Sequence, residues 1–180
     1  MKYRRYFEPG GTYFFTLVTY NRQKILKDEK NINIFIHGHH IIQQKKPFEM
    51  ITFCILPDHV HMLWKLPDND DDYPGRIRLL KSYFSKHYTG HESLKSASRI
   101  KKNERTIWQR RYWEHFIRSE KDLKHHTEYI FYNPVKHGYA NSPSEWKYGN
   151  FMRYVKSGLY EKDWGSGIKL GYFKNIEVYD

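Results

Sequence analysis

Apolar and polar residues follow one another along this chain with the spacings that distinguish strands from helices. Runs rich in β-branched and aromatic residues predict strands over 12–20, 48–56 and 59–66. Apolar residues that recur at helical spacing predict helices over about 28–44, 74–88 and 121–133. Only Pro57 and Asp58 separate the second and third strands, so we expect these strands to pair as an antiparallel hairpin.

The remaining segments show neither spacing. Residues 89–106 are rich in Gly, Ser, Lys and Arg, and we interpret them as a mobile basic loop, as we interpret 67–72 as an acidic loop. Residues 108–118 are interpreted as an irregular turn that enters a further strand. Pro134 has no backbone N–H and Gly138 is a common residue at a helix end, so we expect the segment 134–138 to end or kink the third helix. A short helix is expected over about 150–156, inside an aromatic, glycine-rich tail.

Hairpin strands interleaved with helices of this length are typical of an α+β fold, in which helices cover an antiparallel sheet. The 180 residues contain no internal repeat and no linker, so we expect a single domain over 1–180 with a C-terminal tail at about 142–180. No apolar run approaches the roughly 20 residues of a membrane span, and the N-terminal residues do not begin a signal peptide. We therefore expect a cytoplasmic, nucleoid-associated protein with no membrane partner.

The composition narrows the class of partner. The formal net charge is +11, and the chain contains 16 tyrosines, 11 phenylalanines and 5 tryptophans. Cations neutralise phosphates and aromatic rings stack on unpaired bases, so this composition favours a nucleic-acid partner over the alternative of a generic basic protein. Cys54 is the one cysteine of the sequence, which excludes an internal disulfide and a cysteine-based zinc cluster. Because it lies in an apolar run, we expect an inert buried thiol.

Two histidines of the third predicted strand are candidates for metal binding. Side chains alternate faces along a strand, so His59 and His61 should project from one face. Two imidazoles make half of a metal site and need a third ligand, although the same pattern also fits two ordinary exposed histidines. Of the other histidines, we expect His37, His39 and His40 to lie at the surface. His125 and His126 are adjacent and cannot chelate one ion together, and we expect His115 and His137 to be structural.

The third predicted helix contains a candidate ligand and a candidate nucleophile. Tyr129 and Asn133 are four residues apart, so both should project from one face of that helix. An Asn carbonyl oxygen is a reasonable third ligand beside two imidazoles, and a tyrosine phenol there is a candidate nucleophile for a phosphate. The alternative is that Tyr129 is an ordinary packing residue. The sequence has no GxGxxG, GxSxG, HExxH or Walker motif, so the cofactor and hydrolase classes that these motifs define lack support.

The order of these motifs resembles the HUH single-tyrosine transposase family, which is IS200-like, and in particular its REP-associated tyrosine transposase branch. The resemblance rests on Pro57-Asp58-His59-Val60-His61 and on the later segment from His126 through Tyr129, Asn133, Pro134-Val135-Lys136-His137 to Gly138. Further similar segments are 3–6, 10–16, 66–72 and 111–115, so the resemblance covers nearly the whole chain. The basic segment near 95–105 is longer than the branch leads us to expect.

The resemblance implies a ferredoxin-like antiparallel sheet covered by helices, with the HUH motif on a central strand and the catalytic tyrosine on a helix. It implies that His59, His61 and Asn133 hold Mg²⁺ or Mn²⁺, and imidazole ligands suit Mn²⁺ better. It also implies that Tyr129 attacks a phosphate of single-stranded DNA, which leaves a 5′-phosphotyrosine and a free 3′-hydroxyl. The expected substrates are REP DNA hairpins, which are palindromic repeats flanked by a short single strand.

Basic residues and one histidine are the expected DNA contacts: Arg4, Arg5, Arg78, Lys81, Arg110, Arg111, His126 and Lys136. One alternative function is a non-catalytic protein that binds DNA hairpins on the same scaffold, and another is a generic RNA-binding protein. We expect a monomer, with a dimer as the alternative. From its position and composition, the aromatic tail from Trp146 is expected to pack over the active site and regulate access to it.

Overall fold

The computed structural model describes residues 5–167 and 173. Its strands are β1 (Thr12–Val18), β2 (Glu49–Ile55), β3 (His59–Lys65) and β4 (Trp113–Phe116). Its helices are α1 (Glu29–Lys45), α2 (Tyr73–His87), α3 (Ala97–Lys101), α4 (Glu120–Lys136) and α5 (Phe151–Lys156). The predicted strands and helices are therefore all present, with α3 as an addition.

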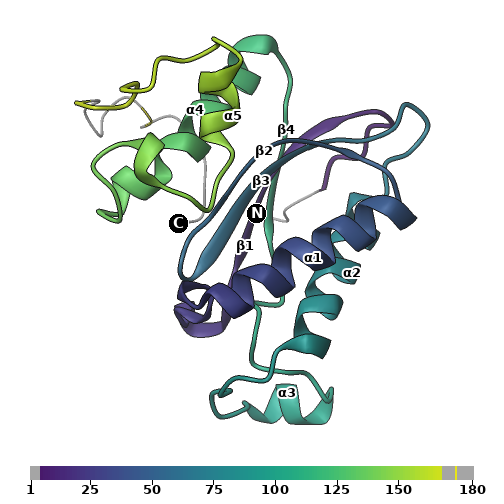
Figure 1. Cartoon of the computed structure of the whole chain (residues 1–180). Helices are drawn as coiled ribbons and strands as arrows, with labels where there is room; N and C mark the ends of the chain where they lie inside the picture. The colour runs from purple at the N-terminus through teal and green to yellow at the C-terminus, as the bar shows by residue number, and fades with distance from the viewer. Residues whose placement is uncertain (1–4, 168–172, 174–180) are drawn as a thin grey trace.

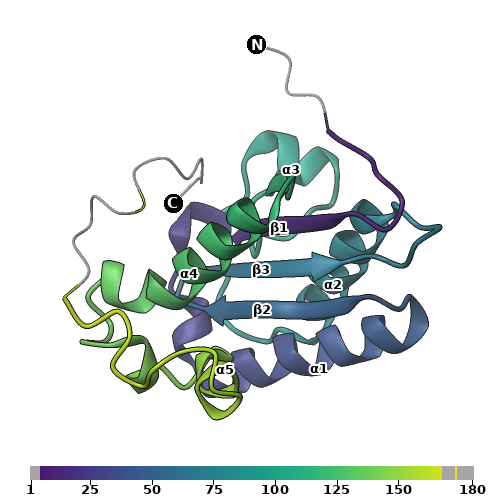
Figure 2. The same ribbon diagram turned by 90° about the horizontal axis from the view of Figure 1, so that it is seen from above.

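The described strands form one antiparallel sheet in the order β2-β3-β1-β4, so that β3 is a central strand. Helices α1 and α2 lie together on one side of this sheet, and α4 and α5 lie on the other (Figure 1). Seen from above, α4 runs across β1 and β3 (Figure 2). With α3 left aside, the order up to β4 is β-α-β-β-α-β, as in the ferredoxin-like motif. The predicted α+β class is confirmed.

Alternation along the central strands divides the core into two layers. Toward α1 and α2, the sheet buries a cluster that includes Tyr13, Phe15, Met62 and Trp64. Toward α4, it buries a smaller cluster that includes Phe14 and Leu63. Because side chains alternate faces along a strand, His59 and His61 share the α4 face with Leu63. The hairpin of β2 and β3 pairs Ile55 with Val60 across the turn, as predicted.

Helix α4 extends further than the sequence indicates. Ser119 caps its start by accepting a hydrogen bond from the backbone N–H of Asp122. The helix then runs through Pro134 and ends at Lys136, where His137 is the C-cap and Gly138 has a φ of +70°. Proline removes one N–H from the helical ladder, but this loss does not end the helix at its last turn. The helix therefore ends inside the segment 134–138, as predicted, although it continues to Lys136, beyond the expected bound at about Asn133.

The basic segment 89–106 is also different from its prediction as a mobile loop. It contains α3, and its arginines are held by backbone carbonyls of the chain. Arg99 is buried and donates to the carbonyl oxygen of Trp108 at 3.0 Å. Arg105 donates to Glu92 Oε1 at 2.7 Å and to the carbonyl oxygen of Tyr88 at 3.0 Å. These charges therefore serve to fix the segment, which the composition alone could not reveal.

Two single-residue predictions have opposite outcomes. His39 was expected at the surface, but it is buried, and its ring packs against Phe48 and Trp64. The expected burial of Cys54 is confirmed, and that burial raises the pKa of its thiol. A search of residues 5–167 and 173 finds no helix with the length and apolar character needed to cross a membrane.

Candidate active site

His59 and His61 lie side by side on β3, beneath α4. Their ring centroids are 4.8 Å apart, and both side chains are buried. Strand β3 is central and covered on both faces, so the two imidazoles are held among packed neighbours rather than at a free edge. The structure thus brings the predicted pair together on one face. The ring of His137, at the end of α4, lies 5.1 Å from the ring of His59.

Asp58 and Arg22 fix the orientation of His59. His59 Nδ1 lies 2.7 Å from Asp58 Oδ1, and Arg22 donates to Asp58 Oδ2 at 3.2 Å. Burial raises the pKa of the Asp58 carboxyl, but the hydrogen bonds from His59 and Arg22 outweigh that effect and bring the pKa to about 2. A carboxylate only accepts hydrogen bonds, so His59 carries its proton on Nδ1. In the neutral imidazole, the lone pair of His59 is therefore on Nε2.

His61 is held by the neighbouring strand. Its Nδ1 lies 2.9 Å from the hydroxyl oxygen of Thr16, which sits directly across from it in the pairing of β1 with β3. The ring of Phe14 stacks on His61, with centroids 5.4 Å apart. When Thr16 accepts the proton of Nδ1, the lone pair of His61 is on Nε2, as in His59.

Asn133 approaches His59 from α4, with its Oδ1 3.4 Å from His59 Nε2. Both atoms present lone pairs, and their separation matches the roughly 3.0–3.4 Å between neighbouring ligands of one ion bound at ~2.1 Å. Asn133 is buried, and its Nδ2 has no hydrogen-bond partner among the described residues. If the O and N atoms of this amide were exchanged, the buried atom without a hydrogen-bond partner would be the carbonyl oxygen instead of the nitrogen. The donor set of His59, His61 and Asn133 therefore fits a divalent cation.

Tyr129 lies one helical turn before Asn133, and its ring centroid is 5.4 Å from that of His61. Lys136 Nζ lies 3.0 Å from the phenol oxygen of Tyr129, and the ammonium group donates a hydrogen bond to that oxygen. Phe173 packs edge-on against Tyr129 with centroids 5.8 Å apart, which agrees with the expectation that the tail approaches this site. The rest of the tail beyond 167 lies outside the described residues. Tyr129 itself is 1% exposed.

The predicted DNA contacts fall into separate environments. Arg78 and Arg111 are exposed, as a phosphate contact requires. Arg5 and Arg110 are paired with Glu114 and Glu104, and Arg4 lies outside the described residues. His126 is 3% exposed, and its contact with DNA stays a prediction.

A basic groove lies between α2 and the segment before β4. This cavity of about 580 Å³ is lined by residues that include Arg5, Arg78, Lys81, Arg110 and Tyr112. Lys81 donates to the carbonyl oxygens of Gln109 and Arg110 at 2.5 and 3.2 Å. Burial, with a contribution from nearby Arg99, lowers the pKa of the Lys81 ammonium to about 8. Several predicted DNA contacts therefore meet in one place.

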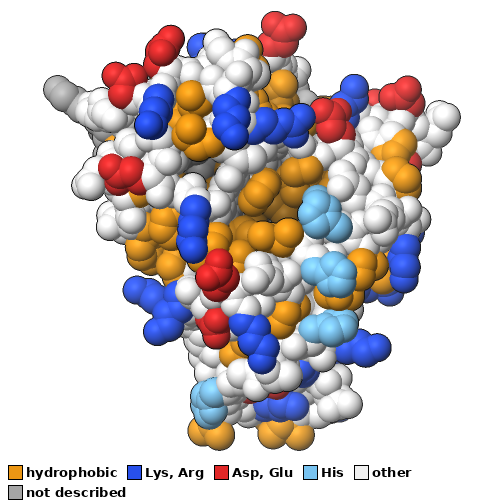
Figure 3. All heavy atoms as spheres, viewed as in Figure 1, with side chains coloured by type: hydrophobic (Ala, Val, Ile, Leu, Met, Phe, Trp, Pro, Cys, Tyr) orange, Lys and Arg blue, Asp and Glu red, His pale blue; other side chains and the backbone are white. Residues whose placement is uncertain are grey.

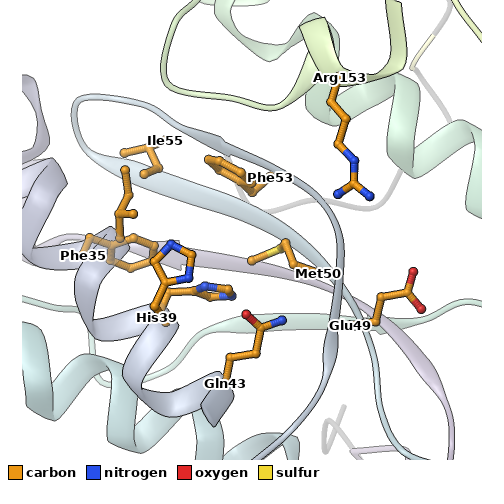
Figure 4. Close-up of a pocket in the computed structure, with 10 residues that line it drawn as sticks. Phe35, His39, Gln43, Glu49, Met50, Phe53, Ile55 and Arg153 are labelled. Atoms are coloured by element: carbon orange, nitrogen blue, oxygen red, sulfur yellow. The ribbon is translucent and has the colours of Figure 1, made fainter. Parts of the chain in front are cut away.

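A second hollow, of about 350 Å³, separates α1 from the outer strand β2. In Figure 3 it is a depression bordered by apolar side chains, with histidines along one side. Figure 4 shows Phe35 and His39 of α1 opposite Met50 and Phe53 of β2, with Arg153 of α5 at the far side. Burial, and to a lesser extent the charge of His40, lower the pKa of His39 to about 4. Its lining includes none of His59, His61, Tyr129 and Asn133, so this hollow is separate from the candidate active site.

Sequence reasoning missed the residues that support the site. Asp58, Thr16 and Arg22 contact the two imidazoles or each other, yet only Asp58 is near them in the sequence. The position of Asp58 directly before His59 was the available signal, because ligand histidines commonly donate to a carboxylate. Lys136 was predicted to contact DNA, and its contact with Tyr129 was missed. A spacing of seven residues, two turns on one helix face, could have indicated it.

Comparison with known protein families agrees with this geometry. Residues 10–133 match the family described as transposase IS200 like. This match covers more than half of the chain, so the chain belongs to the IS200-like transposase family, whose members are tyrosine transposases that cleave and join DNA.

Within this family, the relatives are REP-associated tyrosine transposases. The chain is 40% identical over 167 residues to the REP-associated tyrosine transposase of Escherichia coli K12, which covers 93% of this chain and 92% of the relative. A Haemophilus influenzae protein described in the same terms is 46% identical over 168 residues, covering 93% and 95%. A solved structure of a REP-associated tyrosine transposase bound to a REP hairpin has a TM-score of 0.76 at 35% identity and covers 99% of both chains. The resemblance expected from the sequence is confirmed.

Proposed function

We propose that this chain cleaves and rejoins single-stranded DNA beside REP-type hairpins, through a covalent bond between Tyr129 and a 5′-phosphate. The observation that carries the proposal is the meeting of His59 and His61 of β3 with Tyr129 and Asn133 of α4. The named activity of the relatives, and the hairpin bound to the solved neighbour, support this choice of substrate.

Tyr129 is the proposed nucleophile. Its phenol oxygen forms a bond to phosphorus while the bond from phosphorus to the 3′-oxygen breaks, which leaves a 5′-phosphotyrosine and a 3′-hydroxyl. The phenol loses its proton in this step, and the 3′-oxygen gains one. The ammonium of Lys136, 3.0 Å from the phenol oxygen, stabilises the negative charge that forms there. The reverse reaction rejoins the strands.

His59, His61 and Asn133 would hold Mg²⁺ or Mn²⁺, and their imidazole nitrogens favour Mn²⁺. When bound, the ion supplies positive charge that polarises the scissile phosphate. Asp58 and Thr16 keep the imidazoles in orientations that leave their Nε2 atoms for the ion. The buried setting strengthens each of these electrostatic interactions, since little water screens them.

The basic groove lined by Arg5, Arg78, Lys81 and Arg110 is the proposed contact for the DNA backbone. It lies beside α2, on the opposite face of the sheet from α4. A DNA strand that contacts both the groove and Tyr129 therefore has to pass around an edge of the sheet. Arg111 is exposed just before the edge strand β4, where it can contact a phosphate of that DNA strand. We take the monomer as the working unit.

The test uses a REP-type hairpin with its flanking single strand, labelled on the 3′ side of the expected cut. With Mn²⁺, the wild-type chain should form a labelled covalent adduct that resists denaturation, and Tyr129→Phe should form none. Tyr132→Phe is the matched control, because Tyr132 lies on the same helix and should leave the adduct intact. An adduct that persists in Tyr129→Phe would contradict the proposed nucleophile.

The same assay separates the alternative functions. A non-catalytic hairpin-binding protein would bind the labelled DNA but form no adduct with Mg²⁺ or Mn²⁺, and His61→Ala would change nothing. A generic RNA-binding protein would show no preference for the DNA hairpin over RNA of the same sequence.

A further inference from the structure

Three potential metal ligands meet where the edge strand β4 faces the start of α4. His115 Nε2 lies 3.0 Å from Asp122 Oδ2, and His126 Nδ1 lies 2.9 Å from Asp122 Oδ1. One ligand atom from each of the three residues lies within 4.8 Å of the others. The two imidazole rings are stacked, with centroids 4.5 Å apart and planes 17° apart. Both rings therefore turn a nitrogen toward the same carboxylate.

Strand β4 and helix α4 position the three residues of this cluster, which differ in their exposure to water. Strand pairing places His115 across from Phe14, and Asp122 and His126 are one turn apart on α4. Asp122 also accepts a hydrogen bond from the backbone N–H of Arg118 at 3.0 Å, which fixes its carboxylate. The side chain of His126 is 4% exposed, whereas those of His115 and Asp122 are 24% and 22% exposed. The cluster is thus closed by protein on one side and open to water on the other.

We propose that His115, Asp122 and His126 form a second metal site, which binds Zn²⁺ or a similar transition-metal ion. Two imidazoles and one carboxylate are a common donor set for zinc, and water can complete the coordination from the open side. Mg²⁺ and Ca²⁺ prefer sets made of oxygen atoms, so they should bind weakly here. Ligands of one ion held at ~2.1 Å lie roughly 3.4 Å apart in a tetrahedral site, so a pair as far apart as 4.8 Å has to close by about 1.4 Å, which rotation of the partly exposed His115 can supply.

A metal ion can replace the protons that now lie between the two imidazoles and the Asp122 carboxylate. Each nitrogen that faces the Asp122 carboxylate must carry a proton in order to donate to it. A metal ion would take the place of these protons and bind the same three side chains. His126 Nδ1 also lies 3.0 Å from the backbone carbonyl oxygen of Asp122, to which it can donate. Ligation through Nδ1 would replace this hydrogen bond and move the ring proton to Nε2, which is buried without a hydrogen-bond partner in the described part of the chain.

The position of the site indicates what the ion would do. Phe14 contacts His126 on one side and His61 on the other, with centroid distances of 4.9 and 5.4 Å. The site therefore lies one ring away from the active site, and His126 lies one turn before Tyr129. An ion here would hold the start of α4 on β4, whose pairing with β1 spans only Trp113 to Phe116. This role concerns the placement of α4 and does not depend on strand cleavage.

The test measures Zn²⁺ binding by calorimetry on the full chain. In the background of His59→Ala with His61→Ala, which removes the other imidazole pair, we expect one Zn²⁺ per chain and a rise in Tm on adding Zn²⁺. Adding His115→Gln should weaken binding at least about tenfold and remove the rise in Tm. His91→Gln, at an exposed histidine outside the cluster, is the matched control and should change neither.

Two further measurements keep the test decisive. Asp122→Asn, a substitution of nearly equal shape, should weaken Zn²⁺ binding as His115→Gln does. In the otherwise wild-type chain, His115→Gln should bind one Zn²⁺ fewer than the unmodified protein, whatever the effect of the double background. If the background variant binds no Zn²⁺, or if both His115→Gln and Asp122→Asn bind it as tightly as the background, the second site does not exist.

Discussion

The ammonium nitrogen of Lys136 lies 3.0 Å from the phenol oxygen of Tyr129, two turns earlier on α4. The same nitrogen is 4.9 Å from the centroid of the Tyr129 ring. A fixed cation beside a phenol favours the phenolate, which is the form that attacks phosphorus. The proposed nucleophile and its supporting charge are thus carried by one helix and move together.

Replacing Lys136 by Met should slow formation of the covalent adduct about 100-fold, because the charge beside the phenol oxygen is lost. Hairpin affinity, measured by fluorescence anisotropy, should change much less. Lys124→Met is the matched control, because Lys124 is exposed on the same helix, and its variant should keep wild-type rates. An equal fall in affinity and in rate would instead mean that Lys136 acts only as a DNA contact.

Replacing Asp58 by Asn should weaken Mn²⁺ binding roughly 10- to 100-fold, because the amide no longer holds the proton of His59 on Nδ1. The binding constant is best measured by calorimetry in the His115→Gln background, so that the proposed second site does not contribute. Asp68→Asn, at an exposed acidic residue, should leave the affinity unchanged. Unchanged Mn²⁺ affinity in Asp58→Asn would remove Asp58 from the support of this site.

Replacing Phe173 by Ala should speed adduct formation, because its ring packs against Tyr129, which is almost fully buried. If the covered arrangement holds roughly nine-tenths of the molecules, the gain is about tenfold. Single-turnover kinetics with saturating hairpin measure this gain, and Leu159→Ala, at an exposed residue, provides the comparison. A slower reaction in Phe173→Ala would show that this ring supports the active arrangement.

Acid should destabilise the fold through His39. Its pKa is about 4 in the folded chain and near 6.5 when unfolded, so the unfolded chain binds more protons between these values. Stability that is present above pH 6.5 is therefore lost as the pH falls toward 4, by roughly 2–3 kcal/mol. Urea unfolding at pH 7.5 and 4.5 should show a smaller loss in His39→Leu than in wild type. His91→Gln should lose as much as wild type; an equal loss in His39→Leu would exclude His39 as the cause.

Replacing Arg78 by Ala should weaken hairpin binding uniformly across sequences and reduce the slope of log affinity against log salt by about one. Arg78 is exposed at the basic groove, so its loss removes one phosphate contact without disturbing the core. Affinity measured at several NaCl concentrations gives the slope. Arg153→Ala, at the apolar hollow instead of the groove, should keep the wild-type slope. A slope that is identical in Arg78→Ala would place the DNA elsewhere.

Local patterns in the sequence determined much of this protein. Alternation along 48–66, divided by Pro57 and Asp58, was enough to predict the hairpin that carries His59 and His61, because pleat and turn length are local properties. Helical spacing likewise placed Tyr129 and Asn133 on one face of α4. The ordered motifs then indicated the family. Each of these inferences depends on residues close together in the chain or on their order along it.

Only the tertiary structure decided which residues meet across elements. Thr16 reaches His61 through the pairing of β1 with β3, and His115 reaches His126 because β4 lies beside α4. Composition marked 89–106 as a basic loop, but it did not show that Arg99 donates to the carbonyl of Trp108 and Arg105 to that of Tyr88, 9 and 17 residues away. Burial of His39 and His126 depends on packing between layers in the same way. A sequence records local spacing directly, whereas the contacts between distant segments exist only once the sheet and its helices have packed.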